Sequence, residues 1–324
     1  MSQNCNMNGV VLLDNSLLGM LCKPSSSLLL ALLAVVVLSA FPLSRVRSEE
    51  EPNVQTLQAK SDKGDPEAEY QLGVLYFKGQ AVQQNYPNAL KLLTRAKDKG
   101  HPKAASLLAV IYEKGFGTTA DPKKAVELYR YAAEHGVGFA QYNLAVMLGR
   151  GIGSDKNTDE AFKWYKKAAD QGMVEAAEKL GGYYFYGEGG ATRDYVEAVK
   201  WLRKAADMGA KWSQNTLGAA YEDGLGVTQD PGKAIEWYRR AAESGDARAQ
   251  SNLGRMYARG LGIDRNLPVA YQWLKLGLDQ NDVTAEKVLD EIQPGMTLDQ
   301  IAQGEKLLAE YREHHQAVSN QDKN

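Results

Sequence analysis

The chain has 324 residues, of which 44% are hydrophobic and 24% are charged, and its formal net charge is −2. Lysine and arginine are interspersed with aspartate and glutamate, so the sequence has neither the basic block of a nucleic-acid-binding protein nor an acidic tail. We therefore expect no nucleic-acid partner. The two cysteines, Cys5 and Cys22, do not have the spacing of metal ligands.

An uncharged apolar segment dominates the N-terminal residues 1–48. Residues 24–44 carry no charge and contain the small pair Ser39-Ala40, which resembles a processing site. This pattern predicts either a secretory signal peptide or an uncleaved membrane anchor, because about 20 apolar residues are enough to span a bilayer. We expect the rest of the chain to be exported (periplasmic or secreted), or to be anchored in the inner membrane and lie outside the cytoplasm. Met1 and Met20 are both candidate start sites.

After a polar linker and an expected N-terminal capping helix at 49–63, the sequence repeats itself with a step of about 36 residues. Each copy has an Ala or Ser four residues after its first glycine, then a Leu-Gly or Leu-Ala pair, usually a G-x-G turn, and then an Asp or Asn. Six copies fill residues 64–280, and a partial seventh begins at Asn281. A period of this size indicates a stack of similar supersecondary units. The six copies begin at Gly64, Gly100, Gly136, Gly172, Gly209 and Gly245.

The copy that begins at Gly209 predicts an antiparallel pair of helices. In residues 211–222 the small and apolar positions have the spacing i, i+4, i+5, i+8, which is typical of a helix. Gly224 and Gly226 form the turn that ends this first helix, and Asp230 caps the second. We expect the buried positions of the first helix to be Ser213, Leu217, Gly218 and Tyr221, and those of the second to be Ala234, Trp237, Tyr238, Ala241 and Ala242.

Features of the same kind recur in every copy. The residue equivalent to Gly218 is always Gly or Ala, which indicates a close approach of two helices at that point. The tryptophans at one position of the second helices are expected to pack in the core; they are Trp164, Trp201, Trp237 and Trp273. The expected caps of the second helices are Asn85, Asp121, Asn157, Asp194, Asp230 and Asn266.

These residues together resemble the Sel-1-like repeat, a relative of the tetratricopeptide repeat. The pattern A-x-x-x-L-G-x-x-Y-x-x-G-x-G, followed by K/E-A-x-x-W/L-Y/L-x-K-A-A-x-x-G, is clearest in residues 172–245. The resemblance implies an all-α fold, a right-handed α/α solenoid of helix-turn-helix repeats. It also implies a scaffold or adaptor, often in a bacterial envelope, in secretion or in signalling. The fourth copy departs from the pattern by one extra residue near Gly189-Gly190, so we expect an irregular step there.

The C-terminal residues 281–315 predict a partial repeat followed by a capping helix. Pro294-Gly295 breaks the first helix of this segment, and Thr297 with Gln300 resembles a capping box for a helix over 298–315. Residues 316–324 are polar and are expected to be a disordered tail. The apolar face of the capping helix is expected to contain Ile301, Leu307, Leu308 and Tyr311.

No pattern in the sequence indicates catalysis. The G-x-G turns follow helices and lack the lysine of a phosphate-binding loop. The four histidines do not have the helical spacing of metal ligands, and no nucleophile motif of a hydrolase is present. The sequence therefore predicts a protein without catalytic residues, metal or cofactor, and an envelope hydrolase is the weakest of the hypotheses.

The remaining candidate is the concave face, which the first helices line if the tetratricopeptide resemblance holds. Trp212 occupies a position where the other copies mostly have charged residues, so the repeat itself does not require it. Aromatic and arginine side chains dominate binding hot spots, although single exposed aromatics are common and some of these are expected to be half-buried. We predict a scaffold that binds a protein or an extended peptide there, or alternatively an assembly or secretion factor that binds a glycan or peptidoglycan. The predicted partner-binding residues are Phe139, Tyr142, Phe185, Tyr186, Trp212, Arg248, Arg255 and Arg259.

Overall fold

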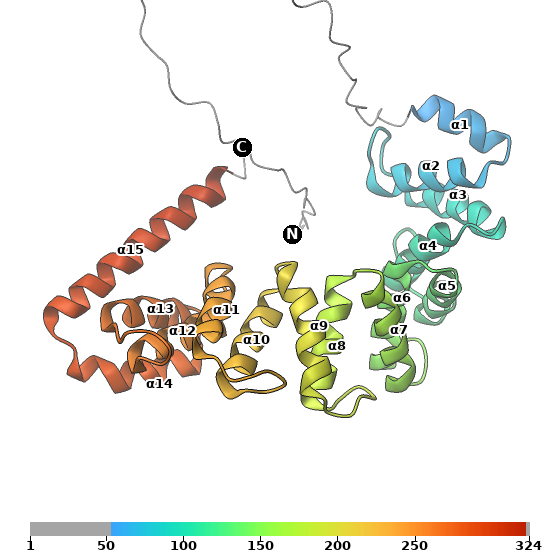
Figure 1. The fold of residues 1–324 in the computed structure, drawn as a ribbon. Coiled ribbons are helices and arrows are strands. Elements are labelled where there is room, and N and C mark those ends of the chain that lie inside the picture. The colour runs from blue at the N-terminus through green and yellow to red at the C-terminus, as the bar shows by residue number, and fades with distance from the viewer. Residues whose placement is uncertain (1–52, 322–324) are drawn as a thin grey trace, which may run out of the picture. The chain divides into compact units, whose positions relative to one another are not determined.

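The computed structural model describes residues 53–321, and this part of the chain contains fifteen α-helices, one short 3₁₀ helix and no strand (Figure 1). The predicted all-α fold is therefore confirmed. The predicted signal peptide or anchor in residues 1–48 lies outside the described residues. None of the helices within 53–321 is both long and apolar enough to cross a membrane.

Twelve of the helices form six pairs, and each of these helices is 13 residues long. The first helices of the pairs are α2 (Pro66–Lys78), α4 (Pro102–Lys114), α6 (Gly138–Arg150), α8 (Val174–Tyr186), α10 (Lys211–Asp223) and α12 (Ala247–Arg259). The second helices are α3 (Tyr86–Asp98), α5 (Pro122–Glu134), α7 (Thr158–Asp170), α9 (Tyr195–Asp207), α11 (Pro231–Glu243) and α13 (Leu267–Asp279).

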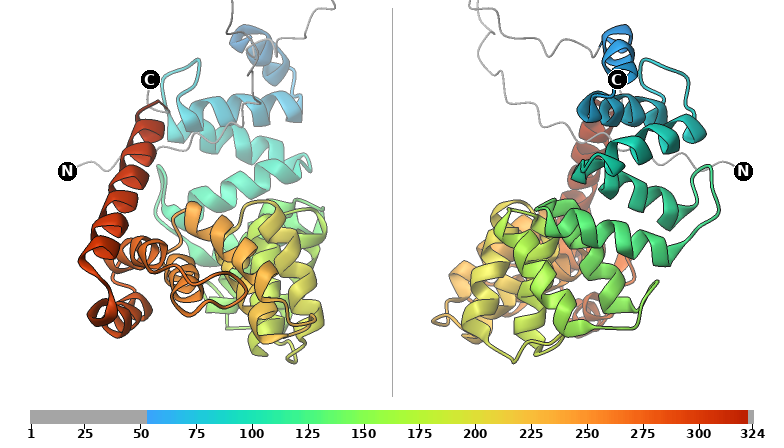
Figure 2. Two further views of the ribbon diagram at one scale, coloured as in Figure 1. Left: turned by 60° about the vertical axis from the view of Figure 1, so that its left-hand side comes forward. Right: turned by 90° about the vertical axis from the view of Figure 1, so that its right-hand side faces the viewer.

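Each first helix packs against the second helix of its own pair, and each second helix packs against the first helix of the next pair (Figure 1, Figure 2). One pair alone would leave an apolar stripe uncovered, whereas stacking buries it in a shared core. Leu217 and Tyr221 lie in this core as predicted, and Trp164, Trp201 and Trp273 are also buried. Trp237 is only half-buried. The predicted helical-repeat solenoid is thus confirmed.

Small residues allow the two helices of a pair to approach closely. A Cβ atom on Gly218 of α10 would lie 2.6 Å from the Tyr238 ring of α11, and one on Gly181 of α8 would lie 2.6 Å from Leu202 of α9. A real Cβ atom does not fit at that distance. The close approach predicted from the recurring small residue is therefore present, and it offsets the intrinsic cost of a glycine inside a helix.

The G-x-G turns join the two helices of one repeat and contact the preceding repeat. Gly226 has a φ of +71°, and a Cβ atom there would lie 2.2 Å from the Tyr195 carbonyl oxygen at the start of α9. Gly153 has the same relationship to the Pro122 carbonyl oxygen at the start of α5. The second glycine of the turn is therefore needed both for its backbone conformation and for its contact with the preceding repeat.

All six predicted caps of the second helices accept a backbone N–H bond through their side chains; they are Asn85, Asp121, Asn157, Asp194, Asp230 and Asn266. The extra residue of the fourth copy lies in the α8–α9 loop, where Gly189 and Gly190 both have positive φ values. Because α8 and α9 keep the length of the other helices, the insertion is accommodated within that loop.

Additional helices lie at both ends of the six pairs. At the N-terminal end α1 (Val54–Asp62) packs against α2, and Leu57 is buried there. At the other end lie α14 (Val283–Ile292), the 3₁₀ helix η1 (Gln293–Gly295) and α15 (Leu298–Gln321). Helix α15 packs on α13 and buries Leu308, and the predicted tail at 316–324 begins inside this helix.

Candidate binding pocket on the first-helix face

The first helices form a surface that we call the first-helix face, built from α2, α4, α6, α8, α10, α12 and α14. Side chains on this face contact one another across the repeat boundaries. Ser213 Oγ donates a hydrogen bond to Glu178 Oε2 at 3.0 Å. Asn252 Nδ2 donates to Asn215 Oδ1 at 3.0 Å. The face is therefore continuous from one repeat to the next.

A pocket of about 400 Å³ opens on this face between the fourth and fifth repeats. Helix α8 supplies most of its wall, the loop after α8 supplies Glu188, and α10 supplies Trp212. A pocket of this size can hold one long side chain of a partner. The residues that line it are Glu178, Lys179, Gly182, Tyr183, Tyr186, Glu188 and Trp212.

Gly182 provides the space for this pocket. Its equivalents in the first three repeats are valines, namely Val74, Val110 and Val146. A Cβ atom on Gly182 would lie 3.3 Å from Cη2 of Trp212. The absence of a side chain at this one position therefore lets the Trp212 ring lie against α8.

The aromatic walls are held by their neighbours and remain accessible. Trp212 is half-buried and packs against the apolar cluster of α9 and α10. Tyr183 is half-buried beside Tyr165, with 5.8 Å between the ring centroids, and burial raises the pKa of the Tyr183 hydroxyl. Tyr186 is 49% exposed. The pocket is thus lined by two half-buried rings, those of Trp212 and Tyr183, and by the exposed ring of Tyr186.

The polar side chains of the pocket make it slightly acidic. Glu178 and Glu188 carry negative charge, and Lys179 is an exposed cation on the same helix turn as Glu178. Glu178 Oε2 accepts the hydroxyl of Ser213, which fixes the carboxylate at the repeat boundary. The lining thus combines aromatic rings with side chains of both charges.

The structure brings only two of the predicted aromatic residues, Tyr186 and Trp212, into this pocket. Phe139 is 51% exposed, and it lies on α6 of the third repeat. Tyr142 packs edge-to-face on Tyr165 at 5.7 Å, and burial raises the pKa of its hydroxyl. Phe185 lies between Tyr186 and Tyr195, with ring centroids 5.2 Å from each. Its ring therefore supports the position of Tyr186.

The predicted arginines do not form one cluster for an acidic partner. Arg255 donates two hydrogen bonds to Glu222, at 2.8 and 2.7 Å, and Glu222 also accepts the hydroxyl of Tyr238 at 2.9 Å. Arg259 pairs with Glu291 at 3.0 Å. Arg248 is exposed and has no ion-pair partner among the described residues. The guanidinium groups of Arg255 and Arg259 are thus bound by carboxylates of the same chain.

Arg255 also lowers the pKa of Glu222. Burial disfavours the charged form of Glu222, but the hydrogen bonds and positive charge of Arg255 outweigh this effect, so the pKa of Glu222 lies below its usual value. The pair links α10 of the fifth repeat to α12 of the sixth. It is a structural contact along the first-helix face.

The predicted binding residues include Tyr186 and Trp212 but none of the other lining residues, which are Glu178, Lys179, Gly182, Tyr183 and Glu188. Gly182 could have been found by comparing one position across the repeats, where it alone lacks a side chain among Val74, Val110, Val146, Ala219 and Arg255. Glu188 lies in the loop that carries the extra residue of the fourth repeat. Both Gly182 and Glu188 could therefore have been found as departures from the repeat pattern.

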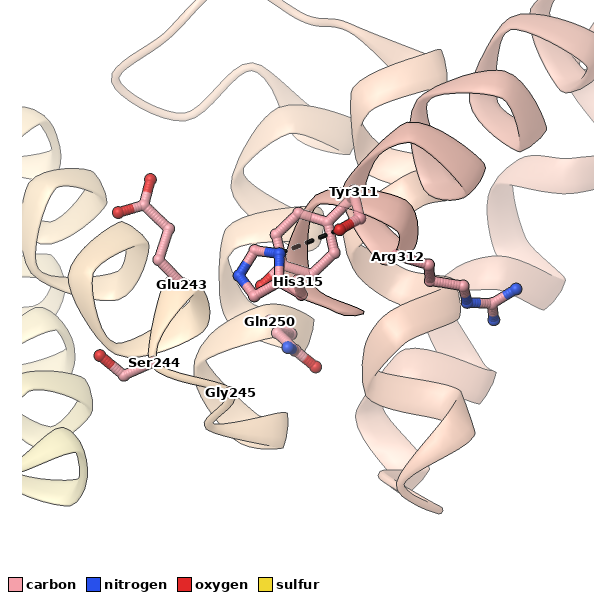
Figure 3. A pocket seen from close by; sticks show the side chains of 7 residues that line it. All are labelled: Glu243, Ser244, Gly245, Gln250, Tyr311, Arg312 and His315. Atoms are coloured by element: carbon pink, nitrogen blue, oxygen red, sulfur yellow. Dashed lines mark hydrogen bonds between the residues drawn. The ribbon is translucent and has the colours of Figure 1, made fainter. Parts of the chain in front are cut away.

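A second pocket, of about 430 Å³, lies where α15 faces the α11–α12 turn (Figure 3). Tyr311 and His315 of α15 stack with 3.9 Å between ring centroids, and they lie opposite Glu243 and Gln250. Arg312 at its edge pairs with Asp279 of α13. The aromatic rings of this pocket come from α15 alone, so it is the weaker candidate for recognition.

Comparison with known proteins identifies the repeats. The Sel1 repeat profile matches six segments, at residues 66–101, 102–137, 138–173, 174–209, 213–246 and 247–282. These matches agree with the helix pairs of the structure. No curated protein matches the chain significantly.

Two solved structures are similar in sequence and in fold. A protective antigen of uropathogenic Escherichia coli with an SLR fold is 31% identical, with a TM-score of 0.70 over 81% of this chain and 58% of the antigen. A Sel1 repeat protein from Oxalobacter formigenes is 34% identical, with a TM-score of 0.63 over 69% of this chain and 90% of that protein. The chain thus spans little more than half of the antigen. It belongs to the Sel1 repeat family, whose helical solenoids are generally non-catalytic scaffolds for protein–protein interaction.

Proposed function

We propose that this protein is a non-enzymatic scaffold that binds a partner protein, through an extended segment of that partner, on its first-helix face. The observation that carries the proposal is the pocket between the fourth and fifth repeats, with Trp212 and Tyr186 as its walls. Tryptophan and tyrosine are enriched among the residues that dominate binding energy. The pocket combines such rings with charged groups at its rim, which is the usual composition of a hot spot.

The position of the pocket supports the same proposal. It uses side chains from two consecutive repeats, so it exists only because the repeats stack. Phe139 is exposed on the same set of helices in the neighbouring repeat and extends the apolar part of this face. A partner segment that follows the face can therefore contact more than one repeat.

Site-specific photo-crosslinking in cells tests the proposal. A photoreactive phenylalanine analogue at Phe139 or at Lys179 should crosslink the full chain to a discrete partner. The matched control places the analogue at Lys200, which is exposed on the second helix α9 of the same repeat as Lys179. Crosslinks that form only from Lys200 would contradict binding on the first-helix face.

We also propose that the protein acts outside the cytoplasm. The uncharged segment at residues 24–44 supports this proposal, since it has the length and composition of a signal or an anchor. Cell fractionation with an antibody to the repeats provides the test, and N-terminal sequencing distinguishes cleavage from anchoring. Full-length protein in the soluble cytoplasmic fraction would contradict this proposal.

A further inference from the structure

We infer that the pocket between α8 and α10 binds an arginine side chain of the partner. The inference rests on the proposed function and specifies the chemistry that the first-helix face recognises. Three observations carry it: the rings of Trp212 and Tyr186, the carboxylates of Glu178 and Glu188, and the basic side chains that lie over three other tryptophans of this chain.

The aromatic walls suit a flat cation. Trp212 and Tyr186 line the pocket from different elements, and Gly182 lets the edge of the Trp212 ring lie against α8. The face of an aromatic ring is negative, so a cation that lies on it is attracted, and tryptophan is the strongest such ring. A guanidinium is planar and weakly hydrated, and it therefore stacks on a ring more readily than a compact ammonium does.

The carboxylates complement the same group. Glu178 and Glu188 are the acidic groups of the lining, and Glu178 is fixed by the hydroxyl of Ser213 at 3.0 Å. Arginine has donors arranged in a plane that match carboxylate oxygens. An acidic side chain in the pocket would be repelled by both glutamates, and an aliphatic one would leave them without a new partner. Lys179 opposes a cation, but it is exposed and lies at the rim.

Other tryptophans of this chain already have a cation over the ring. On three second helices a basic side chain lies over the tryptophan that precedes it by three residues. The cation lies 4.1 Å from the ring centre for Lys167 over Trp164, and 4.6 Å for Arg240 over Trp237. Lys204 lies 4.6 Å from the ring centre of Trp201. Within residues 53–321 no basic side chain lies over Trp212 or Tyr186. No cation of the described residues therefore occupies either ring.

Indole NMR of the full chain labelled with ¹⁵N-tryptophan tests the inference directly. The chain has five tryptophans, and Trp212→Phe assigns the resonance of interest. The probe is the peptide acetyl-Gly-Ser-Arg-Ser-Gly-amide, and its control contains citrulline, which has nearly the same shape without the charge. We expect the arginine peptide to shift the Trp212 indole resonance and to bind about fivefold more tightly than the citrulline peptide. The Trp237 resonance should not move.

Variants of the lining separate the contributions. Gly182→Val should abolish the shift, because it restores the side chain that fills this space in the first three repeats. Glu178→Gln and Glu188→Gln should each weaken binding of the arginine peptide, whereas Lys179→Gln should strengthen it. A general loss of structure would weaken binding in every variant. It would not make Glu178→Gln weaken binding and the adjacent Lys179→Gln strengthen it.

Three results would overturn the inference. The first is equal binding of the arginine and citrulline peptides. The second is the absence of a Trp212 shift with the arginine peptide. The third is a Trp212 shift with an N-acetylglucosamine oligomer but not with the peptide, which would assign the pocket to a sugar. A partner that still crosslinks at Lys179 in any of these cases would leave the proposed function intact and remove only the arginine assignment.

Discussion

Trp212 of the fifth repeat lies directly beside Gly182 of the fourth, so closely that a Cβ atom on Gly182 would come within 3.3 Å of the Trp212 ring. The two residues lie at different positions of their repeats, and neither is required by the repeat pattern. Together they create a pocket at a boundary between stacked units. The candidate pocket in this solenoid thus lies where two departures from the repeat meet.

The first prediction concerns Gly182→Val. Valine is the residue at this position in the first three repeats, and a helix favours it over glycine, so the free energy of unfolding should change by less than about 1 kcal/mol. The valine side chain should occupy part of the pocket and displace the edge of the Trp212 ring, which lies 3.3 Å from the added Cβ. Chemical denaturation with the Trp212 indole resonance as probe measures both effects. Val146→Ala, at the same position of the third repeat, should leave that resonance unchanged.

The second prediction concerns the shared core. Leu217 is fully buried between α10 and its neighbours, and Leu217→Ala should lower the free energy of unfolding by about 2–5 kcal/mol. Val196 is 66% exposed on α9, and Val196→Ala should change stability by no more than about 0.5 kcal/mol. Denaturant titration of both variants measures the difference. A cost below about 1 kcal/mol for Leu217→Ala would be inconsistent with this packing.

The third prediction separates two roles of glycine. Gly226→Ala forces a left-handed backbone on alanine and also places its Cβ 2.2 Å from the Tyr195 carbonyl oxygen, so it should cost about 3 kcal/mol or more. Gly245 has a φ of +80° but no atom within 4 Å of the added Cβ. Gly245→Ala should therefore cost only about 1 kcal/mol, the backbone part alone. Equal costs in thermal unfolding would show that the contact between repeats contributes nothing.

The fourth prediction concerns pH. Because the pKa of Glu222 is lowered in the folded protein, its pair with Arg255 stabilises the fold above the ordinary glutamate pKa and is lost as the pH falls through the lowered value. Glu222→Gln should lower stability by about 1–3 kcal/mol at pH 7 and by progressively less toward pH 3. The exposed pair of Arg259 with Glu291 is the control, and Glu291→Gln should cost about 0–1 kcal/mol. A stability difference between Glu222→Gln and wild type that does not change with pH would contradict the assignment.

The fold was largely predictable from the sequence because each signal is local and occurs six times. The caps such as Asp230, the turn glycines and the recurring small residue at Gly218 each predict a helix boundary or a close contact on their own. Because these signals recur at the same positions in each copy, they also show where each helix of a repeat begins and ends. The extent of α15 was less predictable, since its polar C-terminal sequence continues as a helix to Gln321.

The candidate site was predictable only in part. Trp212 and Tyr186 stand out because they depart from the repeat at their own positions. The pairing of Arg255 with Glu222 was not predicted, since it depends on how far one repeat is rotated relative to the next. The same geometry decides that Trp212 meets Gly182 and that Phe139 lies outside the pocket. The sequence shows which position of the repeat a residue occupies. It does not show which residues of neighbouring repeats touch, because that depends on how the repeats stack.

The most direct test of the account is the affinity of the crosslinked partner for three full-length proteins, measured by calorimetry. These are wild type, Gly182→Val on the first-helix face, and Val196→Ser on the second-helix face of the same repeat. We predict that Gly182→Val weakens binding at least about tenfold, or about 1.4 kcal/mol, and that Val196→Ser has no effect. Wild-type affinity in Gly182→Val with loss of binding in Val196→Ser would contradict the claim that this protein recognises its partner through the first-helix face.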